Sequence, residues 1–153
     1  GFLTRVADGV LQIKAKSAIL GYLNAPSQFT EDGWFDTGDA VEVDGEYFRI
    51  LGRKSEIINV GGEKVYPAEV ESVIKELAAV ADVIVFGEKN SITGNIVCAD
   101  VLPAFELADS RKKEFIVNLK RHCRENLQNY KVPVKVNLIT DRLYNERFKK
   151  IRR

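Results

Sequence analysis

The middle of the chain reads GRKSEIINVGGEKVYPAEVE, from Gly52 to Glu71, and this stretch decides the fold. Residues 54–59 predict a strand that ends at Gly61-Gly62, because a glycine pair permits backbone angles closed to other residues. Pro67 suits the first turn of a helix. Apolar residues then recur at helical spacing and predict an amphipathic helix of about three turns. These residues are Val70, Val73, Ile74 and Leu77.

Upstream of this stretch the pattern is that of strands. Residues 10–20 alternate apolar and polar side chains, which is the period of half-buried strands. Gly, Asn and Pro residues over 21–33 predict a loop that leads into Trp34-Phe35. Residues 40–43 and 46–51 are extended runs around Asp44-Gly45, a dipeptide typical of hairpins. The first third of the chain is therefore predicted to be the end of a β-rich subdomain.

Downstream, strands and helices are mixed. Residues 80–86 and 96–102 are β-branched runs separated by a turn, which predicts neighbouring strands. Ser110 is predicted to cap a second helix, and residues 134–139 form a last strand after Tyr130-Lys131-Val132-Pro133. The buried stripe of that helix is predicted at Ile116, Leu119, Cys123 and Leu127. The order predicts an α+β fold, a small sandwich with a central sheet and two or three helices.

Composition and charge exclude several classes of protein. Of 153 residues, 45% are apolar and 29% charged, which is typical of a folded globular chain. No apolar run is long enough to span a bilayer, so we expect a cytoplasmic protein. Cys98 and Cys123 with a single histidine support neither a disulfide framework nor a metal site. Basic residues gather after residue 141, but no aromatic stacking array accompanies them, so no nucleic-acid partner is expected.

A second motif, DGWFDTGD from Asp32 to Asp39, precedes the Gly52–Glu71 stretch. In this order and spacing the two motifs resemble the adenylate-forming superfamily, which includes acyl-CoA synthetases, peptide-synthetase adenylation domains and luciferases. Gly21-Tyr22-Leu23 and Tyr130 to Pro133 extend the resemblance over nearly the whole chain. It implies that residues 1–52 are the last strands of a large amino-terminal domain. Residues 53–153 would be the mobile carboxy-terminal domain, and the chain would be a fragment.

The resemblance assigns two residues to the nucleotide. It implies that Asp39 accepts hydrogen bonds from the ribose hydroxyls of ATP, a role that suits an ionised carboxylate. It also implies that Arg53 approaches the nucleotide with its planar donors. Ser55 takes the hinge position, where the family usually has Asp or Lys. The alternatives are that Asp39 closes a surface turn and that Arg53 forms a surface ion pair.

Two further segments receive roles in the same way. Val60, Gly61, Gly62 and Glu63 resemble the segment that lines the pantetheine tunnel during thioester formation, although the glycines would equally serve a tight turn. Lys150 aligns with the catalytic lysine that bridges the substrate carboxylate and the α-phosphate. Lys149 stands where the family has glycine. The alternative for this end of the chain is a solvated basic tail.

The implied activity is that of an AMP-forming acyl-CoA synthetase, an acid–thiol ligase. Residues 66–71 look more like the acyl-CoA synthetase version of the motif than the peptide-synthetase version. ATP with Mg²⁺, held mainly by the amino-terminal domain, a carboxylic acid and CoA would be the ligands, and the chain alone would be inactive. One alternative is an adenylation domain that loads a phosphopantetheine carrier protein. The other is a non-catalytic interaction domain that keeps the fold. The sequence specifies neither the acid nor the oligomeric state.

Overall fold

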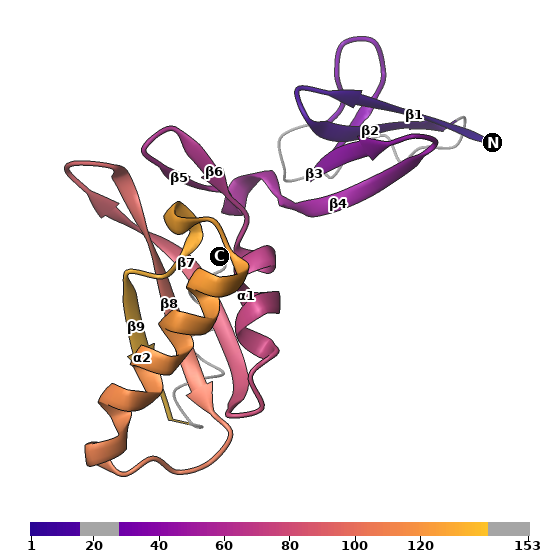
Figure 1. Cartoon of the computed structure of the whole chain (residues 1–153). Coiled ribbons are helices and arrows are strands. Elements are labelled where there is room, and N and C mark those ends of the chain that lie inside the picture. Colours follow the sequence, from indigo (N-terminus) through magenta and orange to yellow (C-terminus); the bar gives the residue numbers. More distant parts are fainter. Residues whose placement is uncertain (16–27, 141–153) are drawn as a thin grey trace. The chain divides into compact units, whose positions relative to one another are not determined.

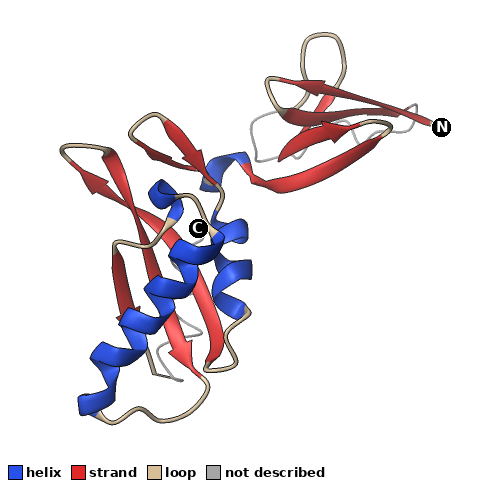
Figure 2. Ribbon diagram, in the orientation of Figure 1, coloured by secondary structure: helices blue, strands red, loops and turns tan. Residues whose placement is uncertain are grey.

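A computed structural model of the chain describes residues 1–15 and 28–140, and contacts divide the chain into two compact units, Gly1–Ser55 and Glu56–Arg153. Figure 1 labels their elements and Figure 2 shows their helices and strands. The predicted boundary between residues 52 and 53 stays a prediction. Residues 16–20 of the first predicted strand region and the Gly21-Tyr22-Leu23 motif lie outside the described residues.

The first unit is an antiparallel sheet of four described strands in the order β1-β2-β3-β4. These strands are β1 (Phe2–Ala7), β2 (Val10–Ala15), β3 (Phe35–Asp44) and β4 (Tyr47–Arg53). The predicted hairpin is confirmed, but Asp44 pairs with Tyr47, so its turn is Gly45-Glu46 and not Asp44-Gly45. Gly45 has a φ of +61°, which explains why a glycine is needed in that turn. The sequence did not predict β1.

Short elements follow β4 along the chain, where the first unit ends and the second begins. Residues 54–59 do not form one strand as predicted, because Lys54–Glu56 is a 3₁₀ turn (η1) and the strand β5 covers only Ile58–Val60. It pairs with β6 (Glu63–Val65) in a hairpin. The helix α1 (Pro67–Lys75) begins at the predicted proline but is shorter than predicted. Leu77 lies beyond its end.

The sheet of the second unit has the order β7-β8-β9. The predicted neighbouring strands are confirmed as β7 (Val80–Asn90) and β8 (Gly94–Pro103), which pair antiparallel. The helix α2 (Asp109–Asn126) and a 3₁₀ turn η2 (Asn129–Lys131) lead to β9 (Lys135–Leu138), which pairs parallel with β8. The α+β fold with two α-helices in the described residues is therefore confirmed.

The predicted cap of α2 is wrong by two positions. Ala108 is the N-cap residue and makes no side-chain cap, and Ser110 lies inside the first turn. Asp109 opens the helix instead, with its carboxylate 2.7 Å from Lys112 Nζ. An acidic side chain at this end is favoured by the helix dipole, so the helix begins without a serine cap.

The core of the second unit lies between the sheet and the two helices. Alternate residues of β7 and β8 point into it, among them Val83, Val85, Val97, Ala99 and Val101. Val70 and Ile74 from α1 and Leu119 and Cys123 from α2 pack against them and are almost fully buried. Each such aliphatic side chain stabilises the fold by roughly 1.5–3 kcal/mol on burial. Among the described residues no helix is long and apolar enough to cross a membrane.

Candidate nucleotide and thioester sites

Thr37, Gly38 and Asp39 form an irregularity in β3. Asp36 pairs with Gln12 and Ala40 with Val10, so three residues of β3 stand opposite the single residue between them on β2. Gly38 has a φ of +73°, a conformation that glycine adopts without strain. The Gly38 N–H donates to Asp36 Oδ1 over 2.8 Å, and Thr37 Oγ1 donates to the Leu11 carbonyl over 2.8 Å. The bulge is thus fixed on both sides.

Asp39 and Arg53 meet across this bulge. They are paired residues of β3 and β4, and Arg53 Nε lies 3.3 Å from Asp39 Oδ1. Arg53 Nη1 also donates to the Thr37 carbonyl over 2.6 Å. A Cβ added to Gly38 would lie 3.2 Å from Arg53 Nη1, so glycine also leaves room for the guanidinium. The structure therefore brings both predicted nucleotide residues together.

The Asp39–Arg53 ion pair is partly exposed to solvent. The Asp39 side chain is 31% exposed and that of Arg53 is 57% exposed. Exposed pairs of this kind contribute only about 0–1 kcal/mol to folding stability. The carboxylate is therefore held in one place while it still faces solvent, which suits an acceptor for the hydroxyls of a ligand. The surface ion pair considered for Arg53 is present, and it is compatible with a second role.

A shallow cavity lies beside the bulge. Its volume is about 350 Å³, and its lining is Gln28, Phe29, Thr30, Asp36 and Gly38. The ring centroids of Phe29 and Phe35 are 5.3 Å apart in an edge-to-face contact. Asp39 does not line this cavity, so the cavity adjoins the predicted ribose acceptor through Gly38.

The first half of the DGWFDTGD motif has a structural role that the sequence did not reveal. Arg5 donates to both carboxylate oxygens of Asp32, over 2.8 and 3.2 Å. Hydrogen bonds from Arg5 and Thr30 lower the pKa of Asp32 to about 2. The Arg5 guanidinium carbon lies 4.5 Å from the ring centroid of Trp34, and Lys14 Nζ lies 5.8 Å from it. This part of the motif therefore holds its own loop to β1 and β2.

In the second unit, Gly61 and Gly62 form the two-residue turn between β5 and β6. Val60 pairs with Glu63, and the two glycines have φ of +57° and +88°. Positive φ at both positions is required by the favoured hairpin turn. A Cβ added to either glycine would meet nothing within 4 Å. The turn conformation alone accounts for the glycine pair, and the space beside it is open to a slender ligand.

The glutamates of the YPAEVE segment have internal partners. Lys131 Nζ lies 3.0 Å from each carboxylate oxygen of Glu69. Glu71 is 8% exposed, and its Oε1 accepts a hydrogen bond from the Val85 N–H of β7 over 3.1 Å. Val70 between them is fully buried. These three residues hold α1 in place, and this structural role of the YPAEVE segment was not predicted from the sequence.

The remaining candidates are placed as follows. Ser55 lies in η1 and is the last residue of the first unit. Lys150 and its neighbour Lys149 lie outside the described residues. Within residues 1–15 and 28–140 no group of three or more His, Cys, Asp or Glu side chains could hold a metal ion. We therefore assign no metal ligand to that part of the chain.

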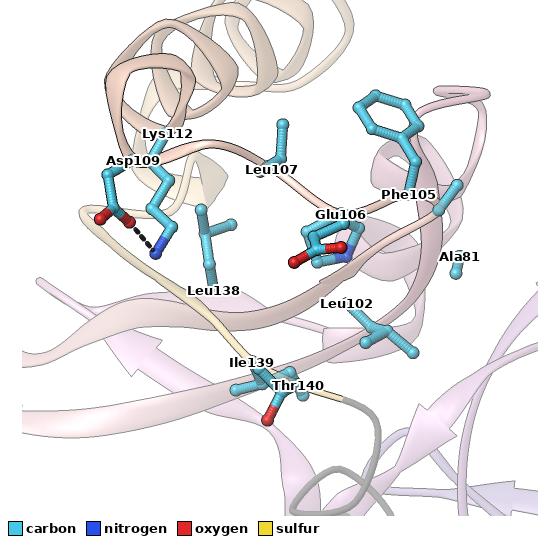
Figure 3. A pocket seen from close by; sticks show the side chains of 12 residues that line it. Ala81, Leu102, Phe105, Glu106, Leu107, Asp109, Lys112, Leu138, Ile139 and Thr140 are labelled. Atoms are coloured by element: carbon cyan, nitrogen blue, oxygen red, sulfur yellow. Dashed lines mark ion pairs between the residues drawn. The ribbon is translucent and has the colours of Figure 1, made fainter.

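A larger hollow of about 780 Å³ in the second unit contains none of the predicted residues (Figure 3). It lies where β8 and β9 end and α2 begins, with Leu102, Leu107 and Leu138 among its lining residues. The Asp109–Lys112 ion pair lies on one side of it, as the dashed line in Figure 3 shows. The charged side chains of this lining are Glu106, Asp109 and Lys112, and they do not identify a ligand for the hollow.

Comparison with known proteins identifies the family. A sequence model of the AMP-binding enzyme C-terminal domain matches residues 69–150 of the chain. The chain belongs to this family. The resemblance to adenylate-forming enzymes is therefore confirmed for the AMP-binding C-terminal domain, which includes α1, the β7-β8-β9 sheet and α2.

Several relatives of the chain are CoA ligases. A 2-succinylbenzoate–CoA ligase of Listeria monocytogenes is 35% identical over 136 residues, which cover 86% of this chain and 28% of the relative. The o-succinylbenzoate CoA synthetase of Bacillus subtilis, in complex with its acyl-adenylate intermediate, has a TM-score of 0.76 and 29% identity. That match covers 90% of this chain and 30% of that chain.

An ATP-bound RpMatB-BxBclM chimera has a TM-score of 0.81 and 29% identity, and the match covers 100% of this chain and 35% of that chain. The chain thus spans 28% to 35% of the length of the three proteins.

Proposed function

We propose that the chain is the carboxy-terminal part of an ATP-dependent acid–CoA ligase of the AMP-forming type. The observation that carries the proposal is the match of 86% of the chain to a curated 2-succinylbenzoate–CoA ligase, with the family model over residues 69–150. The Asp39–Arg53 pair supports it, because it presents a fixed, partly exposed carboxylate and a planar donor on one bulge. A cytoplasmic location is part of the same proposal.

In the first half-reaction the carboxylate of the acid attacks the α-phosphorus of ATP, and pyrophosphate leaves. Asp39 accepts hydrogen bonds from the ribose hydroxyls, and Arg53 donates to the nucleotide. Lys150 stabilises the negative charge that gathers as the carboxylate approaches the phosphate. Mg²⁺ accompanies ATP and would be held by residues outside those described here.

In the second half-reaction the thiol of CoA attacks the carbonyl carbon of the acyl-adenylate, and AMP leaves. Rotation about Ser55 brings the Val60–Glu63 turn toward the acyl group, and the pantetheine arm passes the open side of Gly61 and Gly62. Backbone without side chains allows close approach to so slender a ligand.

One assay tests the reaction type. The ligase that carries this chain is incubated with ATP, a panel of carboxylic acids and either CoA or a holo-carrier protein. We expect pyrophosphate release and an acyl-CoA product. Acyl transfer only to the carrier protein would replace CoA ligation by carrier loading, and absence of adenylate with every acid would favour a non-catalytic interaction domain.

A second assay tests the lysine. We expect Lys150→Ala to abolish adenylate formation and Lys149→Ala to leave most of it. The reverse result would move the catalytic role to Lys149. The 153-residue chain alone is expected to release no pyrophosphate.

A further inference from the structure

The Gly61-Gly62 turn is supported by the turn that joins β7 and β8. The Gly61 N–H donates to the Thr93 carbonyl over 2.8 Å. Asn95 Nδ2 donates to the Asn59 carbonyl over 3.0 Å, so a side chain of β8 fixes the strand that leads into the turn. Two hydrogen bonds, one accepted by Thr93 and one donated by Asn95, therefore hold the backbone on the amino-terminal side of the glycine pair.

The supporting turn is itself ordered by side chains. Asn90 Oδ1 accepts hydrogen bonds from the Ile92 and Thr93 N–H groups, over 2.9 and 3.2 Å. Thr93 Oγ1 donates to the Asn95 carbonyl over 2.7 Å. Side-chain hydrogen bonds to the local backbone restrict a turn to one conformation. The acceptor of the Gly61 N–H is thus held in place before any ligand arrives.

The base of the β5-β6 hairpin is fixed by packing instead. Ile58 is 3% exposed and belongs to the core of the second unit. A Cβ added to Gly87 of β7 would lie 3.0 Å from Ile58 Cγ2, so glycine lets the two strands approach closely. Apolar contact anchors one end of the hairpin, and the polar bonds of Thr93 and Asn95 anchor the other.

We propose that Asn95 and Thr93 are positioning residues for thioester formation. They hold the Val60–Glu63 turn in the geometry that receives the pantetheine arm, and they act through Asn59 and Gly61 without touching the ligand. The inference rests on the proposed role of that turn. It assigns residues 93–95, which lie outside the motifs of Asp32–Asp39 and Gly52–Glu71, to the second half-reaction, and it leaves the first half-reaction independent of them.

The test separates the two half-reactions in the ligase that carries this chain. Asn95→Ala removes the side-chain donor, and Asn95→Asp keeps the shape of the side chain but has no side-chain N–H group. We expect the KM for CoA to rise about threefold to tenfold, as the loss of one hydrogen bond implies, with acid-dependent pyrophosphate release unchanged. Hydrogen exchange at the Gly61 amide of the 153-residue chain should accelerate in both variants.

Ile92→Ala is the matched control. Ile92 lies in the same turn, but the residue is 90% exposed and its N–H, not its side chain, is bonded to Asn90. We expect this variant to leave the KM for CoA and the Gly61 exchange rate unchanged. Gly62→Ala tests the turn itself, since its added Cβ enters the open space and its φ of +88° becomes strained.

The outcomes distinguish the two levels of the proposal. If Gly62→Ala raises the KM for CoA and the Asn95 variants do not, the positioning role is wrong and the role of the turn stands. If none of these variants changes thioester formation, the role of the turn is wrong. If the Asn95 variants slow both half-reactions equally and lower the melting temperature, Asn95 is only a structural residue and the proposal fails.

Discussion

Lys131 Nζ lies 3.0 Å from both carboxylate oxygens of Glu69, which joins two sequence motifs that are 62 residues apart. The Lys131 side chain is 14% exposed and that of Glu69 is 44% exposed. η2 is thereby attached to the first turn of α1. The ion pair is partly desolvated, so it should contribute more than a pair on an open surface.

We expect Lys131→Met and Glu69→Gln each to destabilise the chain, with a coupling energy between them of about 0.5–1 kcal/mol. Urea unfolding of the wild type, the two single variants and the double variant gives this value. High salt should reduce it, because exposed charges are screened. Additive effects of the two substitutions would mean that the pair makes no net contribution.

Glu71 provides a second test of α1. Its Oε1 accepts the Val85 N–H in a buried place, so Glu71→Ala leaves a donor of β7 without that acceptor. The expected loss is about 1–3 kcal/mol in the free energy of unfolding. Glu71→Gln keeps an acceptor oxygen and should recover most of it. Glu114→Ala on the exposed side of α2 is the control, and we expect it to change stability by less than about 0.5 kcal/mol.

The sequence predicted the elements that depend only on a few adjacent residues. Pro67 and the apolar spacing after it predicted α1, and the glycine pair at 61–62 predicted a turn, because each depends on a few adjacent residues. The contacts that define the site are not local. The ion pair between Arg5 of β1 and Asp32, which lies in the loop before β3, joins residues that are 27 positions apart.

The errors have physical reasons as well. β1 has adjacent apolar residues at Phe2 and Leu3, both exposed, so it lacks the alternation that indicates a strand. Within residues 54–59 only Ile57 and Ile58 are strand-forming types, and Lys54–Glu56 before them form the 3₁₀ turn η1. The bulge at Gly38 could be anticipated only from the pairing of β2 with β3, which no sequence pattern specifies.

Gly38 should be required for two separate reasons. Its φ of +73° disfavours any other residue, and a Cβ there would crowd Arg53 Nη1. Gly9 has nearly the same φ, +75°, with nothing within 4 Å of an added Cβ. Gly9→Ala therefore reproduces the backbone strain of about 1 kcal/mol without the crowding.

We expect Gly38→Ala to raise the KM for ATP in the ligase by about tenfold and Gly9→Ala to leave it within about twofold, at similar losses of stability. Equal effects of both variants on the KM would show that strain alone matters and that the position of Arg53 does not.

Asp32 should make the first unit sensitive to acid. Its pKa is lowered from 3.8 to about 2, first by the hydrogen bond from Arg5. A lowered pKa in the folded state means that the contribution to stability is present above pH 4 and is lost as the pH falls toward 2. Arg5→Gln should raise the pKa of Asp32, as measured by NMR titration. Fluorescence of Trp34 should follow the same transition, since Arg5 lies over its ring. A pKa that stays near 2 in Arg5→Gln would contradict this assignment.

The two cysteines should be inert while the chain is folded. Burial raises the pKa of Cys98 to about 12, with Glu88 accepting the Sγ hydrogen bond over 3.2 Å, and burial raises that of Cys123 to about 11. At pH 8 almost no thiolate is present at either position, and the thiolate is the reactive form. We expect no modification by iodoacetamide in the native state and modification of both residues in denaturant, as measured by mass spectrometry. Modification of Cys98 in Glu88→Gln but not in Lys89→Ala would show that Glu88 protects the thiol, whereas protection in both variants would show that burial alone suffices.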